Sequence, residues 1–233
     1  MTIKAVVFDL DGTLLDSLED IAFSVNAAMR KVSCPEHSVE TIRSFVGYGI
    51  ARLIKDALPK DVEKGIYKEA CDFFYKHYVE HADSKTVVYP GILDMLKQLK
   101  SMGIILAVLS NKAEPAVEVL CDKFFPGIFK ITAGAREDFF KKPDPTRLLS
   151  ILKELEVTAA STVYVGDSDV DVYTAHNAKV HSIAVDWGYR NRKSLLAAGA
   201  SLVFLAVLLI TRHLPCRPLR PVLWNKGNWC AVA

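Results

Sequence analysis

Three short apolar segments of this chain each end in a cluster of polar residues, and this repeated arrangement constrains the fold more than any other feature. The segments, residues 3–8, 104–109 and 162–165, are nearly continuous in Val, Ile, Leu, Ala and aromatic residues. Such runs are typical of strands that are covered on both faces of a parallel sheet. Helical patterns lie between them, so the sequence predicts repeated βα units and an α/β fold.

The polar clusters that follow these strands are Asp9-Leu10-Asp11-Gly12-Thr13, Ser110-Asn111-Lys112 and Gly166-Asp167-Ser168-Asp169. In parallel sheets, ligands bind beyond the carboxyl ends of the strands, near the point where the strand order reverses. We therefore expect the clusters to meet at one edge of a Rossmann-like parallel sheet with helices on both faces.

The segment between the first two strands reads as an all-helical insert over residues 16–84. Helical patterns cover residues 17–31, 39–46, 50–58 and 62–82, and the first helix can be capped by Asp16 or Ser17. Residues 1–15 and 85–204 are then expected to form the sheet domain. Its remaining predicted elements are helices at 92–101, 115–124, 145–155, 169–178 and 194–198, and strands at 128–132 and 180–185.

The last part of the chain, residues 205–233, is basic and apolar and has no clear period. An edge strand followed by disordered residues is the preferred interpretation, and a membrane-surface or partner-binding segment is the alternative. All 27 acidic residues lie at or before Asp186, whereas seven of the 29 basic ones follow it, so the first 186 residues carry a formal charge of −5. This mildly acidic body argues against nucleic-acid binding.

The cysteines and the apolar segments indicate a soluble protein of a reducing compartment. The five cysteines are odd in number and widely spaced, which fits a reduced cytoplasmic protein. The longest uninterrupted apolar run, residues 202–210, is shorter than the roughly 20 residues of a membrane-spanning helix. We expect no signal segment and no transmembrane segment. The sequence does not determine the oligomeric state, and a homodimer is one possibility.

The first cluster carries the residues expected for phosphoryl transfer. A phosphate monoester repels an attacking anion, so an enzyme must neutralise its oxygens and place a nucleophile in line. Asp9 is the candidate nucleophile and would form an aspartyl-phosphate. Asp11, on the same side of an extended backbone, can act as general acid toward the leaving oxygen and then as base for water.

Positive charge and hydrogen-bond donors are needed around these carboxylates. Asp167 adds a further carboxylate, and three acidic groups without His or Cys favour Mg²⁺ over Zn²⁺. Ser110 and Asn111 are expected to donate to phosphate oxygens, and Lys142 to supply fixed positive charge. In supporting roles, Asp171 could hold that lysine, Gly12 allows a tight turn at the phosphate, and Thr13 can donate its hydroxyl.

With these clusters the chain resembles the haloacid dehalogenase-like hydrolase superfamily, whose phosphatases carry four short motifs. The four matching stretches here are Asp9-Leu10-Asp11-Gly12-Thr13, Ser110-Asn111, Lys142-Pro143 and Gly166-Asp167-Ser168-Asp169-Val170-Asp171. The resemblance implies Mg²⁺ bound by the Asp9 carboxylate, the Asp11 main-chain carbonyl and the Asp167 carboxylate. It also implies a mobile helical cap, which matches residues 16–84. Gly47 would then lie in a cap loop that meets the substrate, and a simple break between two helices is the alternative.

Within the superfamily the chain is most similar to phosphoglycolate phosphatases. Three stretches carry this similarity: Leu15-Asp16-Ser17, Val46-Gly47-Tyr48-Gly49 and Asp186-Trp187-Gly188-Tyr189-Arg190. The resulting expectation is magnesium-dependent hydrolysis of a small phosphorylated metabolite, first of all 2-phosphoglycolate. A sugar phosphate, a nucleotide or pyrophosphate are alternative substrates, because these motifs handle the phosphoryl group and not its carrier. A catalytically idle binding protein of the same fold is the alternative from another class.

Overall fold

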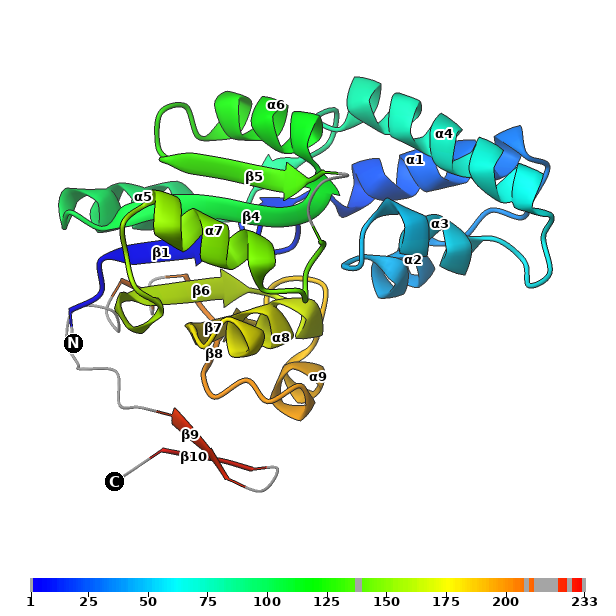
Figure 1. The fold of residues 1–233 in the computed structure, drawn as a ribbon. Coiled ribbons are helices and arrows are strands. Elements are labelled where there is room, and N and C mark those ends of the chain that lie inside the picture. Colours follow the sequence, from blue (N-terminus) through cyan, green and yellow to red (C-terminus); the bar gives the residue numbers. More distant parts are fainter. Residues whose placement is uncertain (1, 137–139, 208–209, 212–221, 226–227, 232–233) are drawn as a thin grey trace.

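A six-stranded parallel sheet forms the centre of the molecule, in the order β5-β4-β1-β6-β7-β8 (Figure 1). The computed structural model describes residues 2–136, 140–207, 210–211, 222–225 and 228–231. The strands are β1 (Ala5–Phe8), β4 (Ile105–Ala113), β5 (Ile131–Ala135), β6 (Thr162–Gly166), β7 (His181–Val185) and β8 (Val203–Phe204). The chain runs from β1 outward to β5 and then returns to β6, so the strand order reverses beside β1 and the predicted α/β class is confirmed.

Apolar side chains of the strands alternate between two buried layers, as the pleat of a sheet requires. Val6 and Phe8 pack into one layer with α5 (Ile92–Ser101) and α6 (Glu114–Phe124). Val7 packs into the other layer with α7 (Thr146–Glu154) and α8 (Asp169–Asn177). Both faces of the sheet are therefore covered, which explains why its strands read as continuous apolar runs.

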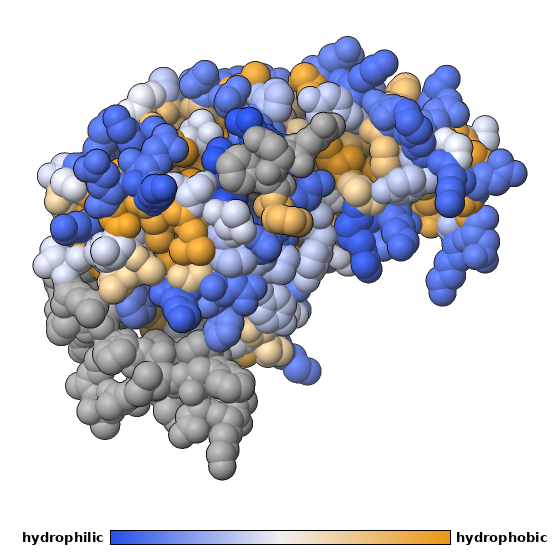
Figure 2. Space-filling view, in the orientation of Figure 1, coloured by the Kyte–Doolittle hydropathy of each residue, from blue (hydrophilic) through white to orange (hydrophobic). Residues whose placement is uncertain are grey.

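Four helices between β1 and the rest of the sheet form a second unit with its own core. They are α1 (Leu18–Lys31), α2 (Val39–Phe45), α3 (Ile50–Ala57) and α4 (Lys64–His81), and we call residues 18–81 the helical unit. Its core includes Val25, Ile42, Ile54 and Phe74. The helical unit lies beyond the carboxyl ends of the strands (Figure 1), and its visible surface is mainly hydrophilic (Figure 2).

The two connections to the helical unit pair with each other, which the sequence did not predict. Strand β2 (Leu15–Asp16) runs antiparallel to β3 (Val87–Val88), with Leu15 opposite Val88. Two-residue strands leave no periodic signal, because alternation needs several residues to be visible. The ribbon they form joins the helical unit to the sheet.

Two strands of the sheet differ from their predicted limits. β4 continues through Ser110, Asn111 and Lys112 to Ala113, with a shift in register against β5 after Leu109. β5 starts at Ile131 and not at Ile128, which packs against the core from the preceding loop. Polar residues at the end of a strand therefore extend it here, because backbone pairing and not side-chain polarity determines where the ladder ends.

The end of the chain is described only in part. β8 pairs with β7 at the sheet edge, and Val207 and Ile210 pack into the main core. β9 (Val222–Asn225) and β10 (Asn228–Ala231) pair antiparallel, where disordered residues were expected. Val222, Trp224 and Trp229 are of residue types that favour strands. The other residues after 207 lie outside the described residues. In the described part of the chain, no helix combines the length and apolar character needed to cross a bilayer.

Candidate active site

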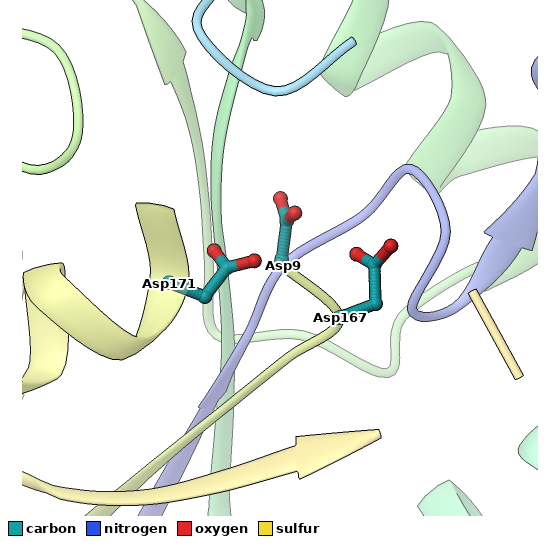
Figure 3. Close-up of side chains that lie close together, drawn as sticks. All are labelled: Asp9, Asp167 and Asp171. Carbon is teal, nitrogen blue, oxygen red and sulfur yellow. The ribbon is translucent and has the colours of Figure 1, made fainter. Parts of the chain in front are cut away.

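Three buried carboxylates converge where the strand order reverses. Asp9 follows β1, Asp167 follows β6, and Asp171 lies in the first turn of α8. One oxygen from each lies within 4.8 Å of the others, and the three side chains gather around one space (Figure 3). The structure therefore brings Asp9 and Asp167 together, as a shared cation would require.

Burial and mutual repulsion make this cluster costly to ionise. Burial, together with the nearby charges of Asp171 and Asp167, raises the pKa of Asp9 well above its usual range, although Lys142 opposes this. The pKa of Asp167 is raised to about 7, first by burial and then by Asp171. A positive charge between these groups would remove the conflict.

The Asp167 carboxylate is fixed from two sides. Thr13 donates its hydroxyl to Oδ1 at 3.1 Å, and the backbone N–H of Tyr189 donates to Oδ2 at 2.7 Å. Gly12 has a φ of +83°, and a Cβ at that position would lie 2.3 Å from Oδ2 of Asp167. The glycine is thus required both by its left-handed backbone and by its approach to the carboxylate.

Lys142 provides the positive charge next to Asp9. Its Nζ lies 2.9 Å from Oδ1 of Asp9 and 2.7 Å from Oδ1 of Asp171, and it donates to the Tyr164 hydroxyl at 3.1 Å. Burial acts to lower the pKa of Lys142, but Asp171 and Asp9 together raise it well above its usual value. The lysine is therefore a fixed ammonium. Ser168 completes the arrangement, since its backbone N–H and hydroxyl both donate to Oδ2 of Asp171.

Asn111, in β4, joins the Gly47 and Lys142 loops and uses both side-chain N–H donors to do so. Its Nδ2 donates to the carbonyls of Gly47 at 2.9 Å and Lys142 at 3.0 Å, and its Oδ1 accepts from the Lys142 N–H at 2.8 Å. The structure thus places Asn111 as a support for the Lys142 loop, where direct donation to phosphate was expected. The Ser110 Oγ accepts from the Lys112 N–H at 3.2 Å, which leaves its hydroxyl proton available for a phosphate oxygen.

Asp11 has two partners that the sequence analysis did not assign to it. Its Oδ1 lies 2.9 Å from the Lys112 Nζ and accepts from the hydroxyl of Ser17. Ser17 precedes α1 but makes no capping bond with its side chain, and its Oγ lies 3.0 Å from the Tyr189 hydroxyl. The sequence analysis gave no role to Lys112 or Tyr189. Lys112 lies in the polar cluster that follows the second strand, and Tyr189 lies in a stretch that carries the family similarity.

The helical unit closes over these groups and completes a pocket. Arg190 donates to the carbonyls of Arg43, Ser44 and Val46 at the end of α2. Tyr48 donates to Asp169 at 2.7 Å, next to the Gly47 carbonyl that accepts from Asn111. On the side of the sheet, the pocket between the two units is lined by Asp9, Asp167 and Lys142. On the other side, the helical unit contributes two tyrosines and several apolar side chains: Tyr75, Tyr78, Ile21, Ile50, Leu53, Phe74 and Val79.

Comparison with known proteins agrees with this geometry. The sequence profile of the haloacid dehalogenase-like hydrolases matches residues 6–185. A phosphoglycolate phosphatase of Pseudomonas syringae pv. tomato is 34% identical over 206 residues, which cover 86% of this chain and 75% of that protein. The profile match over residues 6–185 includes Asp9, Asp167 and Asp171.

Two solved structures share the fold. A crystal structure from Lactobacillus delbrueckii subsp. bulgaricus, whose assignment as a phosphoglycolate phosphatase is itself a prediction, has a TM-score of 0.88 and 31% identity. The superposition covers 93% of this chain and 100% of that chain. CbbY from Rhodobacter sphaeroides, crystallised as a variant with xylulose-1,5-bisphosphate, has a TM-score of 0.75 and 25% identity, with 88% of this chain and 95% of that chain covered.

Proposed function

We propose that this chain, which belongs to the haloacid dehalogenase-like hydrolase family, hydrolyses a small phosphate monoester, with 2-phosphoglycolate as the first substrate to test. The observation that carries the proposal is the convergence of Asp9, Asp167 and Lys142 at one edge of the sheet. A phosphoryl group needs a nucleophile and positive charge at one point, and these side chains can provide both. The relatives named phosphoglycolate phosphatase support the choice of substrate.

The residues fit a magnesium ion. Among the described residues, the cluster offers carboxylate oxygens and no His or Cys, which suits a hard cation. Asp171 pairs with Lys142 and accepts two bonds from Ser168, and it does not line the pocket. Asp9 and Asp167 do line the pocket, so they are the carboxylates proposed to bind the ion, together with the Asp11 main-chain carbonyl that the family resemblance implies. Bound Mg²⁺ would supply positive charge that neutralises the carboxylates and the phosphoryl oxygens.

The catalytic steps follow from the positions of the two aspartates. An oxygen of Asp9 attacks phosphorus, the bond to the ester oxygen breaks, and Asp11 gives its proton to that leaving oxygen. Water then attacks the aspartyl-phosphate and loses a proton to Asp11, which releases inorganic phosphate and restores the Asp9 carboxylate. Lys142 and Ser110 stabilise negative charge on the phosphoryl oxygens in both steps.

The helical unit is proposed to act as a cap that excludes water from these steps. Many of its contacts with the sheet domain are polar, among them the bonds of Arg190 to the end of α2, those of Tyr48 and Gly47, and that of Lys112 to Tyr78. Such contacts can break and reform more easily than a large apolar interface. The β2–β3 ribbon is the place where the movement would be absorbed.

A sugar phosphate is the second candidate substrate. CbbY was crystallised with a sugar bisphosphate on a related fold. The helical unit lines the pocket mainly with apolar side chains, however, and the Tyr78 hydroxyl already binds Lys112, so few partners are left for the hydroxyl groups of a sugar. The geometry therefore favours a smaller leaving group.

A panel of phosphate monoesters tests the proposed function. With Mg²⁺, we expect inorganic phosphate to be released from 2-phosphoglycolate with a kcat/KM at least about tenfold above that for sugar phosphates, nucleotides and pyrophosphate. Excess chelator should stop the release, and added Mg²⁺ should restore it. If the wild-type protein releases no phosphate from any ester with Mg²⁺ present, the idle binding protein is the better interpretation.

Thermal unfolding tests the metal site without using activity. Because the pKa of Asp167 is raised to about 7, the metal-free folded protein binds a proton more tightly than the unfolded chain does. Its stability should therefore fall as the pH rises from about 4 to about 7, and a cation that replaces the proton should stabilise most above that range. The Mg²⁺ concentration is the same at both pH values and equals about 100 times the Kd at pH 8. It should raise Tm by roughly 5–10 °C at pH 8 and by clearly less at pH 5.5, where protons compete for the site.

The matched control for this measurement is Asp167→Asn, which keeps the shape of the side chain but removes its charge. This variant should lose most of the gain in Tm at pH 8. An equal gain at both pH values, or a gain that survives in the variant, would contradict a cation bound by Asp167.

A further inference from the structure

We propose that Lys112 determines substrate preference by binding an acidic group on the leaving part of the substrate. The inference rests on the proposed function, and it assigns the chemical class of what the pocket accepts beyond the phosphoryl group. That class is a small monoester whose leaving group carries a carboxylate close to the ester oxygen.

The position of Lys112 follows from that of Asp11. In the proposed reaction Asp11 gives its proton to the leaving oxygen, so the leaving group must contact the Asp11 carboxyl group. The Lys112 Nζ lies 2.9 Å from Oδ1 of Asp11, at the end of β4. A carboxylate one carbon away from the ester oxygen can therefore reach the ammonium within one hydrogen-bond length.

The ammonium has a hydrogen-bond donor left over. Its side chain is 5% exposed, so water contributes little, and it has three N–H groups. Asp11 accepts from one, and the hydroxyl of Tyr78 in α4 accepts from another. Within the described residues, no third acceptor is bound to Lys112. The remaining donor belongs to a buried charge, and an anionic ligand in the pocket would satisfy it.

The other cations at the pocket are already committed. Lys142 binds Asp9 and Asp171, and Arg190 donates to three carbonyls at the end of α2. The helical unit lines the pocket mainly with apolar side chains, among them Leu53 and Phe74, and its Tyr78 hydroxyl already binds Lys112. A neutral leaving group would fill this space but leave the third N–H of the ammonium without an acceptor, whereas a carboxylate would accept from it.

A comparison of two substrates in two variants tests the assignment. Ethyl phosphate has the two-carbon leaving group of 2-phosphoglycolate without its carboxylate, so the ratio of kcat/KM for the two esters measures recognition of the acidic group. Lys112→Met should lower this ratio about 10- to 100-fold, mainly through a higher KM for 2-phosphoglycolate. The control is Lys130→Met, at an exposed lysine just before β5. It lies at the amino end of the strands, opposite to the end that carries Lys112, and should leave the ratio unchanged.

The possible results separate this inference from the proposed function. If Lys112→Met lowers kcat/KM for both esters by the same factor, Lys112 acts through Asp11 or the fold and the assignment is wrong. If the wild-type protein hydrolyses neither ester nor any other monoester, the proposed function falls, and the assignment falls with it.

A second measurement uses the wild-type protein and does not depend on whether the variant folds. Glycolate should inhibit hydrolysis of ethyl phosphate competitively, and ethylene glycol at the same concentration should not. Equal inhibition by the two compounds would overturn the assignment, because only glycolate carries the carboxylate.

Discussion

Replacing Asp9 by Asn is expected to lower kcat at least about 10,000-fold while the fold stays intact. The Asn amide lacks the negative oxygen that attacks phosphorus, so no aspartyl-phosphate can form. Its Oδ1 can still accept the two bonds that Oδ1 of Asp9 accepts, from Lys142 at 2.9 Å and from the Leu10 N–H at 2.7 Å. Single-turnover phosphate release from 2-phosphoglycolate measures the effect.

The stability of this variant should move in the opposite direction to its activity. The pKa of Asp9 is raised first by burial and then by the charges of Asp171 and Asp167, so removing the Asp9 charge relieves both costs in the metal-free protein. Without Mg²⁺ at pH 7.5, the variant should be at least as stable to urea as the wild type. Asp122→Asn, at an exposed position near the end of α6 far from the carboxyl ends of the strands, serves as control and should change neither property.

Two results would contradict this account. An Asp9→Asn variant that keeps more than a few per cent of the wild-type rate would exclude Asp9 as nucleophile. A variant that is inactive but largely unfolded would show that Asp9 is needed for the fold, and the loss of activity would then carry no information on chemistry.

The main strands could be predicted because burial on both faces leaves a strong local signal. Val6, Val7 and Phe8 are fully buried in two different layers, so every position of the run is apolar. The place of Asp9 and Asp167 at neighbouring strand ends followed from that pattern, since parallel strands present their carboxyl ends at one edge. The resemblance to a known family then added roles that spacing alone does not give.

What could not be predicted depends on contacts between distant residues. Lys112 is assigned by its distance to Asp11 and Tyr78, and Tyr189 by its bond to Asp167; none of these partners is near in sequence. Ser17 has the residue type of a helix cap, but tertiary structure uses its hydroxyl on Asp11. Local patterns identify residue types that suit a role, whereas the fold decides which role is taken.

Replacing Lys142 by Met is the second change with a large expected effect, because it acts on both catalysis and stability. The Nζ pairs with Asp9 at 2.9 Å and with Asp171 at 2.7 Å, and all three side chains are buried. We expect kcat to fall about 1,000-fold, since fixed positive charge at the phosphoryl oxygens is lost. The free energy of unfolding should fall by about 3–5 kcal/mol, since two buried carboxylates lose their partner. Phosphate release and urea unfolding measure the two effects.

A double variant separates these two effects of Lys142. In Lys142→Met with Asp171→Asn, one uncompensated charge is removed, while an amide oxygen can still accept from the Ser168 N–H and hydroxyl. We expect the double variant to recover a large part of the lost stability but none of the lost activity, because the charge next to Asp9 is still absent. The neighbouring exposed lysine gives the control Lys141→Met, which should behave like the wild type. Recovery of activity in the double variant would mean that Lys142 serves only to neutralise Asp171, and its contact with Asp9 would then have no part in phosphoryl transfer.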